Sequence, residues 1–209
     1  MRRLVPPLSP LALLVLTVVA FLPGQSRADY PKPSPYPKTW QLDFDHSIPK
    51  RVVVQTADSN IPKAYWYMTY TVTNNTDKEQ LFLPAFEMLT EDGRVIRNDF
   101  KIPGSVFDAI KKREGDRFLE PAALVGGEIR LGPSQAKDGV AIWPEPMARM
   151  GRFSIFVSGL SGETATVKGP GDKDVILRKT LQLNFLIRGD DVYPGEDEVN
   201  ENPSEWVMR

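Results

Sequence analysis

Large apolar residues recur at every second position through much of this chain. In the segment "AYWYMTYTVT" (64–73), the even positions carry the large side chains of Trp66, Met68, Tyr70 and Val72. The odd positions carry tyrosines and threonines. This period of two predicts a β-strand with one buried face, so Trp66 is expected in the core and Tyr65 and Tyr67 on the opposite face.

Turn signals separate this strand from others of the same kind. The run from Asn74 to Asp77 predicts a turn, because short Asn and Asp side chains tolerate left-handed backbone and bond to nearby backbone groups. Glu91-Asp92-Gly93 predicts a hairpin between two strands. Strand-like runs resume at "GGEIRLG", "DGVAIW", "RFSIFVSGL" and "VILRKTLQLNFLIRG". Short strands at this spacing predict a mainly β protein, an antiparallel β-sandwich of immunoglobulin-like type.

One segment follows a helical period instead. "PGSVFDAIKKREG" (103–115) places Val106, Phe107 and Ile110 on one face, with Ser105 as the candidate N-cap and Gly115 as the stop signal. We therefore expect one short inserted helix. Its apolar face needs a partner, and the tyrosine face of strand 64–73 is the interpretation we favour.

The N-terminus has the features of an export signal. Arg2 and Arg3 precede an apolar run (11–22), and small residues at 26 and 28 occupy the positions that a signal peptidase recognises. The run is shorter than the roughly 20 residues of a membrane-spanning helix, so cleavage before Asp29 is favoured over a retained anchor. We expect four segments, namely a signal peptide (1–28), a Pro-rich N-terminal arm (29–39), a β-sandwich domain (40–189) and an acidic C-terminal tail (190–209).

Charge and cysteine content narrow the function classes. Removing the signal peptide removes three arginines and leaves 23 basic and 27 acidic residues, a net charge of −4. A chain with this balance does not attract a polyphosphate backbone, so no nucleic acid is expected as a partner. An exported chain without cysteine must be held by its core alone, which favours a bacterial periplasm or cell envelope.

The sequence contains few residues that could form a catalytic site. His46 is the single histidine, it lies in "DFDHSIP" after a strand, and the chain has no cysteine. Thiol proteases and histidine-rich zinc sites are thereby excluded. Ser161 lies in "SGLSGETATV", which predicts a strand, a turn and a strand rather than a nucleophile elbow. We therefore predict no catalytic, cofactor-binding or metal-binding residues, and no enzyme.

The C-terminal segment could be read as a calcium-binding site or as a solvated acidic tail. Residues 189–209 hold seven carboxylates and one arginine, but their spacing does not match the EF-hand loop. A solvated acidic tail is favoured, although Trp206 is unusual for such a tail and suggests that the C-terminus docks on the domain.

Four residues are candidates for contact with a ligand or partner. "WPEPM" (143–147) is expected to leave its strand at the prolines, which would place Trp143 and Met147 at a loop end of the sandwich. Tyr65 and Tyr67 join them if the helix leaves them exposed. The interpretation we favour for Trp143 and Met147 is instead that they cap the core, because large apolar side chains are usually buried.

Three quoted stretches carry a family resemblance. "YWYMTYTVTNNTDKEQLFLPAFEMLTEDG", "DGVAIWPEP" and "GRFSIFVSGLSGET" resemble an uncharacterised family of exported bacterial proteins, of the kind abundant in planctomycetes. "YTVTNNTDKE" is also similar to a strand-turn element of bacterial extracytoplasmic immunoglobulin-like domains. The resemblance implies an exported address and a sandwich fold, and it implies no activity and no site residues.

Three functions are weighed. The first is an exported, non-enzymatic domain of the periplasm or envelope that binds another protein or has a structural role. The second is a module that binds glycan or another small ligand through surface aromatics. Exposed aromatic rings in a row would favour glycan, whereas an apolar patch with a polar rim would favour protein. A concave pocket with carboxylates around His46 would favour the third, an enzyme.

Overall fold

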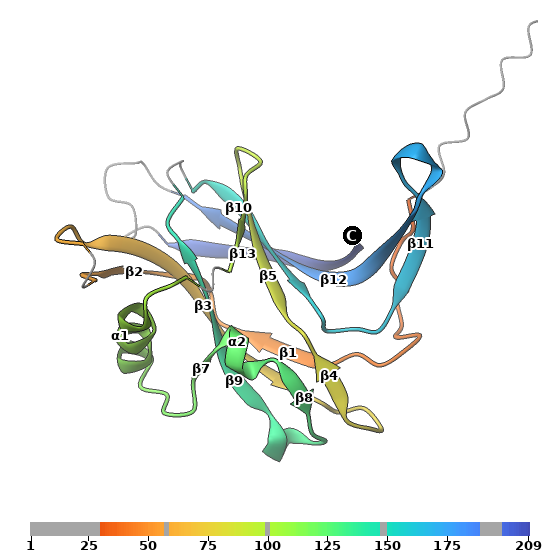
Figure 1. The fold of residues 1–209 in the computed structure, drawn as a ribbon, viewed down its shortest axis with the longest axis horizontal. Helices are drawn as coiled ribbons and strands as arrows, with labels where there is room; N and C mark the ends of the chain where they lie inside the picture. The colour runs from red at the N-terminus through yellow and green to blue at the C-terminus, as the bar shows by residue number, and fades with distance from the viewer. Residues whose placement is uncertain (1–29, 57–58, 99–100, 147–149, 189–197) are drawn as a thin grey trace, which may run out of the picture. The chain divides into compact units, whose positions relative to one another are not determined.

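The structure is a computed structural model, and it describes residues 30–56, 59–98, 101–146, 150–188 and 198–209. The predicted signal peptide lies outside the described residues. The chain is mainly β, with almost entirely antiparallel sheets and two helices, which confirms the coarse prediction of fold class (Figure 1).

The strands vary widely in length, from the two residues of Glu120–Pro121 to the 14 residues of Asp174–Ile187. The strands are β1 (Asp43–His46), β2 (Lys50–Val54), β3 (Lys63–Thr73), β4 (Gln80–Phe82), β5 (Ala85–Thr90), β6 (Val95–Arg97), β7 (Glu120–Pro121), β8 (Gly127–Ile129), β9 (Lys137–Pro144), β10 (Arg152–Ser158), β11 (Thr164–Lys168), β12 (Asp174–Ile187) and β13 (Val199–Met208). The helices are α1 (Gly104–Glu114) and α2 (Ala122–Val125), with 3-10 turns η1 (Pro133–Gln135) and η2 (Pro170–Asp172).

The strands form two larger sheets and one small one. In the first sheet, β1 and β2 pair with one edge of β3 and β9 pairs with the other edge, while β7 adds a short parallel contact to β9. In the second, the order is β6, β5, β10, β12 and β13, and β11 pairs with the first half of β12. β4 and β8 pair only with each other. The predicted hairpin around Gly93 is confirmed as the turn between β5 and β6.

The main core lies between the two larger sheets. The apolar side of β3, with Trp66 and Met68, meets Phe86 of β5, Ile155 of β10 and Phe185 of β12, and all five side chains are buried. The period-two pattern of 64–73 therefore predicted both the strand and its core face. Burial of these large side chains is the main source of stability in a chain without disulfides.

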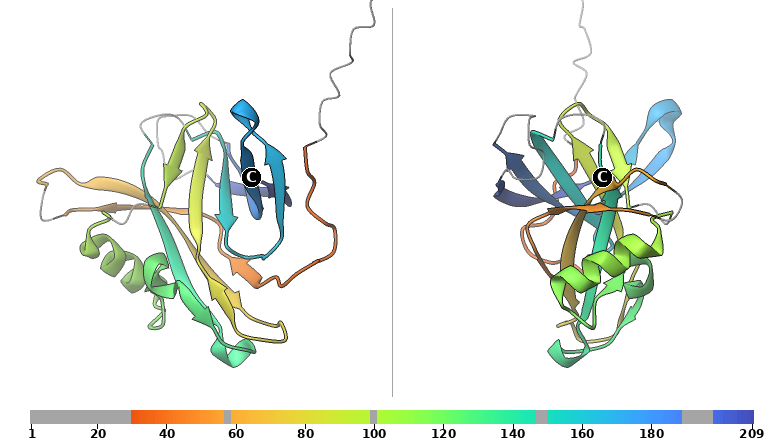
Figure 2. Two further views of the ribbon diagram at one scale, coloured as in Figure 1. Left: turned by 45° about the vertical axis from the view of Figure 1, so that its right-hand side comes forward. Right: turned by 90° about the vertical axis from the view of Figure 1, so that its left-hand side faces the viewer.

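The predicted helix forms and covers the opposite face of β3. Val106 and Ile110 of α1 are buried with Tyr65 and Tyr67 in a second apolar cluster, which confirms the favoured interpretation (Figure 2). Gly115 ends α1 in the left-handed region, with φ of 70°, a conformation that glycine adopts without strain.

Two details of the helical prediction were wrong. The N-cap of α1 is Pro103, with no capping side-chain hydrogen bond, and Ser105 lies inside the helix. The prediction of a single helix also missed α2, a four-residue turn whose Ala122 and Val125 are buried. Such a short helix gives no periodic signal in the sequence, because it has little more than one turn.

The described part of the predicted acidic tail is a strand. β13 pairs antiparallel with β12 from Met208 to Val199, and Trp206 packs against the main core. The domain therefore does not end at residue 189. The expected docking of Trp206 is confirmed, since its ring faces the buried ammonium of Lys179 at 5.1 Å. Edge-strand acids and Pro203, which carries no N–H, gave this strand a tail-like composition.

The Pro-rich arm is also attached to the domain. Ser34 is buried, and both its backbone N–H and its hydroxyl donate to a carboxylate oxygen of Glu163, at 2.8 and 2.7 Å. The ammonium of Lys179 donates to the Ser34 carbonyl and lies 3.3 Å from Glu163. Burial would raise the pKa of Glu163, but the bonds from Ser34 and Lys179 outweigh it and lower that pKa. The arm is thus held at Ser34 rather than solvated along its whole length.

Candidate functional site

The predicted contact residues are not at the surface. Tyr65, Tyr67 and Trp143 are 5%, 0% and 0% exposed, and Met147 lies outside the described residues. Trp143 stays within β9, which runs on to Pro144 at the last register position, so it faces the main core opposite Trp66. The prediction that these rings contact a ligand or partner is therefore corrected: α1 and the second sheet cover them.

The hydroxyl of Tyr67 has a structural partner instead. It donates to Glu114 at 2.6 Å, and the ammonium of Lys50 donates to both oxygens of the same carboxylate. Burial and this bond raise the pKa of Tyr67. Burial acts to raise the pKa of Glu114 as well, but the hydrogen bonds from Lys50 and Tyr67 outweigh it and lower that pKa. This network fastens the C-terminal end of α1 to the sheet.

A hollow of about 310 Å³ lies beside β1. It is lined by the acidic residues Asp45, Asp116 and Asp138, together with His46, Ser47, Thr69, Tyr70, Thr71 and Leu119. Thr71 donates to Asp138 at 2.7 Å, and Asp45 is the register partner of Thr71 on the other side. Carboxylates thus gather next to His46, as the enzyme hypothesis required.

The imidazole of His46 does not join them. Successive residues of a strand point to opposite faces, so Asp45 and His46 diverge. The imidazole stacks on Phe44, meets the edge of the buried Phe185 ring and faces Glu201 at 3.5 Å. Among the described residues, no group of three or more acidic or histidine side chains is placed to hold a metal ion. The contacts of the imidazole are therefore with Phe44, Phe185 and Glu201 rather than with the aspartates of the hollow.

An apolar surface lies at the small sheet. Leu81 and Leu83 flank β4 residue Phe82, which is buried, and their own side chains are 59% and 65% exposed. Leu124 of α2 is 66% exposed. The chain at the end of β4 approaches the end of α2 at Gly126, where an added Cβ would lie 3.6 Å from Pro84 and 3.7 Å from the Phe82 carbonyl oxygen. We call Leu81, Leu83 and Leu124 the leucine surface.

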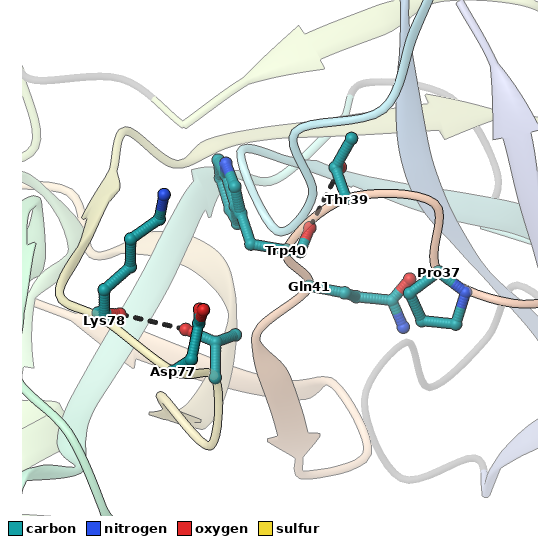
Figure 3. A pocket seen from close by; sticks show the side chains of 7 residues that line it. Pro37, Thr39, Trp40, Gln41, Asp77 and Lys78 are labelled. Carbon is teal, nitrogen blue, oxygen red and sulfur yellow. Dashed lines mark hydrogen bonds between the residues drawn. The ribbon is translucent and has the colours of Figure 1, made fainter.

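A second recess lies between the arm and the turn after β3, with a volume of about 520 Å³ (Figure 3). It is lined by Pro37, Thr39, Trp40, Gln41, Thr76, Asp77 and Lys78, and we call it the Trp40 pocket. Trp40 is partly exposed, and the rest of its side chain packs against the main core. Its backbone carbonyl accepts a hydrogen bond from Gly162 at 3.1 Å.

The sequence predicted one part of this pocket, the turn, but not the position of Trp40. The turn from Asn74 to Asp77 was predicted from its composition and forms where expected. Trp40 was counted only as a strand residue. Its approach to the turn is set by pairing of residues distant in the chain, such as the bridge between Gln41 and Ser161, which no local pattern reveals.

Comparison of the chain with protein-family models, with curated proteins and with solved structures found no match. In the part of the chain that the structure describes, no helix has the length and apolarity needed to cross a membrane.

Proposed function

We propose that this protein is an exported, non-enzymatic domain of the bacterial periplasm or envelope that binds another protein. We further propose that its sheets form a β-sandwich of the immunoglobulin-like type, as in the exported family that the sequence resembles. The leucine surface is the observation that carries the proposal of protein binding.

Solvent-exposed leucines at this density need an explanation. Leu81 is exposed in the two-stranded sheet and Leu83 just after β4. Leu124 is exposed on α2, two residues before Gly126, which lies near Phe82 and Pro84. Apolar side chains that cluster on a surface typically mark a contact with another macromolecule. Burying each leucine against a partner would contribute roughly 1.5–3 kcal/mol of favourable transfer free energy.

The surroundings of the leucine surface fit a protein partner better than a glycan. Glu128 lies opposite Leu81 in the register, and Arg130 follows just after the end of β8, so polar side chains of both charge signs lie near Leu81. An apolar centre with a polar rim is the usual composition of a protein interface.

The test is capture of a partner from the envelope fraction of the native host with the tagged protein. Leu81→Glu should abolish capture, because it places a charge in the centre of the contact. Ile176→Glu is the matched control, since Ile176 is 62% exposed and lies on the β11–β12 hairpin, which extends away from the other strands (Figure 2).

Thermal unfolding of both variants should match that of the parent, because neither position is buried. Capture of one stoichiometric protein by the parent and by Ile176→Glu, but not by Leu81→Glu, would support the proposal. Equal capture by all three chains, or none by the parent, contradicts it.

A further inference from the structure

We infer that the Trp40 pocket binds a neutral pyranose ring, as one residue of an oligosaccharide. This inference is independent of the leucine surface, with which the pocket shares no residue. It also differs from the glycan hypothesis drawn from the sequence, because none of the residues of that hypothesis lines the pocket.

The pocket has the size and mixed lining of a small-ligand site. Its volume of about 520 Å³ falls within the roughly 300–1,000 Å³ of known ligand pockets. Trp40 and Pro37 supply apolar surface, and the remaining lining residues supply hydroxyl, amide, carboxylate and ammonium groups. Figure 3 shows the Trp40 indole and the Lys78 side chain pointing in the same direction, with Asp77 below them.

Both walls are fixed before any ligand arrives. On one side, Trp40 is anchored through the bond to Gly162 and through the bond from the Leu42 N–H to the Leu160 carbonyl. Its indole nitrogen lies over Gly162, where an added Cβ would come within 2.5 Å. The indole position therefore depends on the absence of a side chain at Gly162.

The opposite wall is organised by Asn74, which is fully buried. Its amide donates to the carbonyls of Lys78 and Ile129, at 3.0 and 2.9 Å, and its oxygen accepts from the N–H and hydroxyl of Thr76. Every polar group of the Asn74 side chain is thus used within the protein. A preorganised turn of this kind binds without first losing conformational entropy.

Asp77 and Lys78 are left available by this arrangement. Both side chains are exposed, and neither has a hydrogen bond or ion pair to another described residue. They add one acceptor group and one donor group to the lining of the pocket, and their charges are opposite. A sugar hydroxyl both donates and accepts hydrogen bonds, so it can bond to the carboxylate and to the ammonium. A charged ligand would be attracted by one of these groups and repelled by the other.

The Trp40 ring supplies the second half of the recognition. A pyranose presents an apolar face of C–H groups and an edge of hydroxyls, and an indole is a large, rigid apolar surface. Stacking on Trp40 and bonding to the Asp77–Lys78 edge satisfy both parts of such a ring together.

The test is an array of neutral and charged oligosaccharides that includes maltotriose, cellotriose and chitotriose, followed by calorimetric titration of the best binder. We expect saturable binding of a neutral oligosaccharide. Asp77→Ala and Lys78→Ala should each weaken it at least tenfold. Glu79→Ala is the matched control, because Glu79 is exposed in the same turn and does not line the pocket.

Trp40→Phe would lower the affinity further, but it also alters the edge of the core, so the two turn variants decide the outcome. The inference is overturned if no neutral oligosaccharide binds, if only charged ones bind, or if Asp77→Ala and Lys78→Ala bind as the parent does. Leu81→Glu should keep full sugar binding, which separates failure of this inference from failure of the proposed function.

Discussion

The two faces of β3 are both buried, but by different means. The face with Trp66 and Met68 meets the second sheet and belongs to the main core. The face with Tyr65 and Tyr67 is covered by α1 and by Ile102 and Leu119 on either side of it, in a smaller cluster. Further along the same face, beyond the helix, the side chains turn polar, with Thr71 bonded to Asp138.

The two faces differ in the interactions that hold the covering element, the second sheet or α1, against β3. The second sheet is connected along its whole length by ladders of backbone hydrogen bonds, whereas α1 is held by its apolar side and by the network around Glu114. An element with few buried contacts opens at lower free energy than the core strands do. We therefore expect α1 to be the less stable cover.

The largest effect is expected in the main core. Met68 is fully buried between the sheets, and Met68→Ala leaves a cavity that two rigid sheets cannot close. We expect the free energy of unfolding to fall by about 3 kcal/mol, as is typical of large-to-small substitutions in a core. Denaturant unfolding measures it, with Val53→Ala at a half-exposed position of β2 as the control, expected to change it by less than about 0.5 kcal/mol.

A smaller and more local effect is expected beneath α1. Ile110 is fully buried in the second cluster, and Ile110→Ala should cost about 2 kcal/mol, because the helix can settle partly into the space. Amide hydrogen exchange distinguishes the two faces. Exchange should rise in α1 and stay unchanged in β10, and a uniform rise in both elements would show that the helix opens only with the whole domain.

The smallest effect is pH-dependent and involves Glu114. Its pKa in the folded protein lies below the value of about 4.3 of an unfolded chain, so it stabilises the fold above that pH. This contribution disappears as the pH falls through the folded pKa. Lys50 is partly exposed to solvent, which screens the pair, so we expect less than about 1 kcal/mol.

Unfolding measured from pH 7 to pH 3 tests this. Glu114→Gln should lose less stability than the parent over the acid range, and Glu79→Gln, with an exposed carboxylate, should follow the parent. Glu163 also has a lowered pKa, so the parent and Glu114→Gln should both keep some acid sensitivity. Identical curves for the parent and Glu114→Gln would contradict a role for this carboxylate.

Local sequence patterns predicted those elements whose formation depends on residues close together in the chain. The alternation through Trp66 gave β3 its core face, Gly93 gave a hairpin, and Gly115 gave the end of α1. Even the partner of α1 followed from the sequence, because Tyr65 and Tyr67 needed a cover and the helix needed an apolar surface. Trp143 was placed at a loop end because Pro144 was taken to break its strand.

The two ends of the domain show where local patterns fail. β13 has the acids and the proline of a solvated tail, and its pairing with β12 is a contact between distant residues. Ser34 is buried by a lysine and a glutamate more than a hundred residues away. Neither contact has a signature in the local sequence, because the stabilising partner lies elsewhere in the chain.

The sequence by itself determined the β class, the helix and its stop, the turn at Asn74 and the absence of disulfides, because each depends on side-chain periodicity, backbone preference or residue inventory. The tertiary structure decided which side chains reach solvent. It buried the three described aromatics that were candidates for contact with a ligand or partner, left Leu81 and Leu124 exposed, and brought Trp40 to the Asn74 turn. Exposure depends on what the rest of the chain packs against, and that is settled only when distant strands pair.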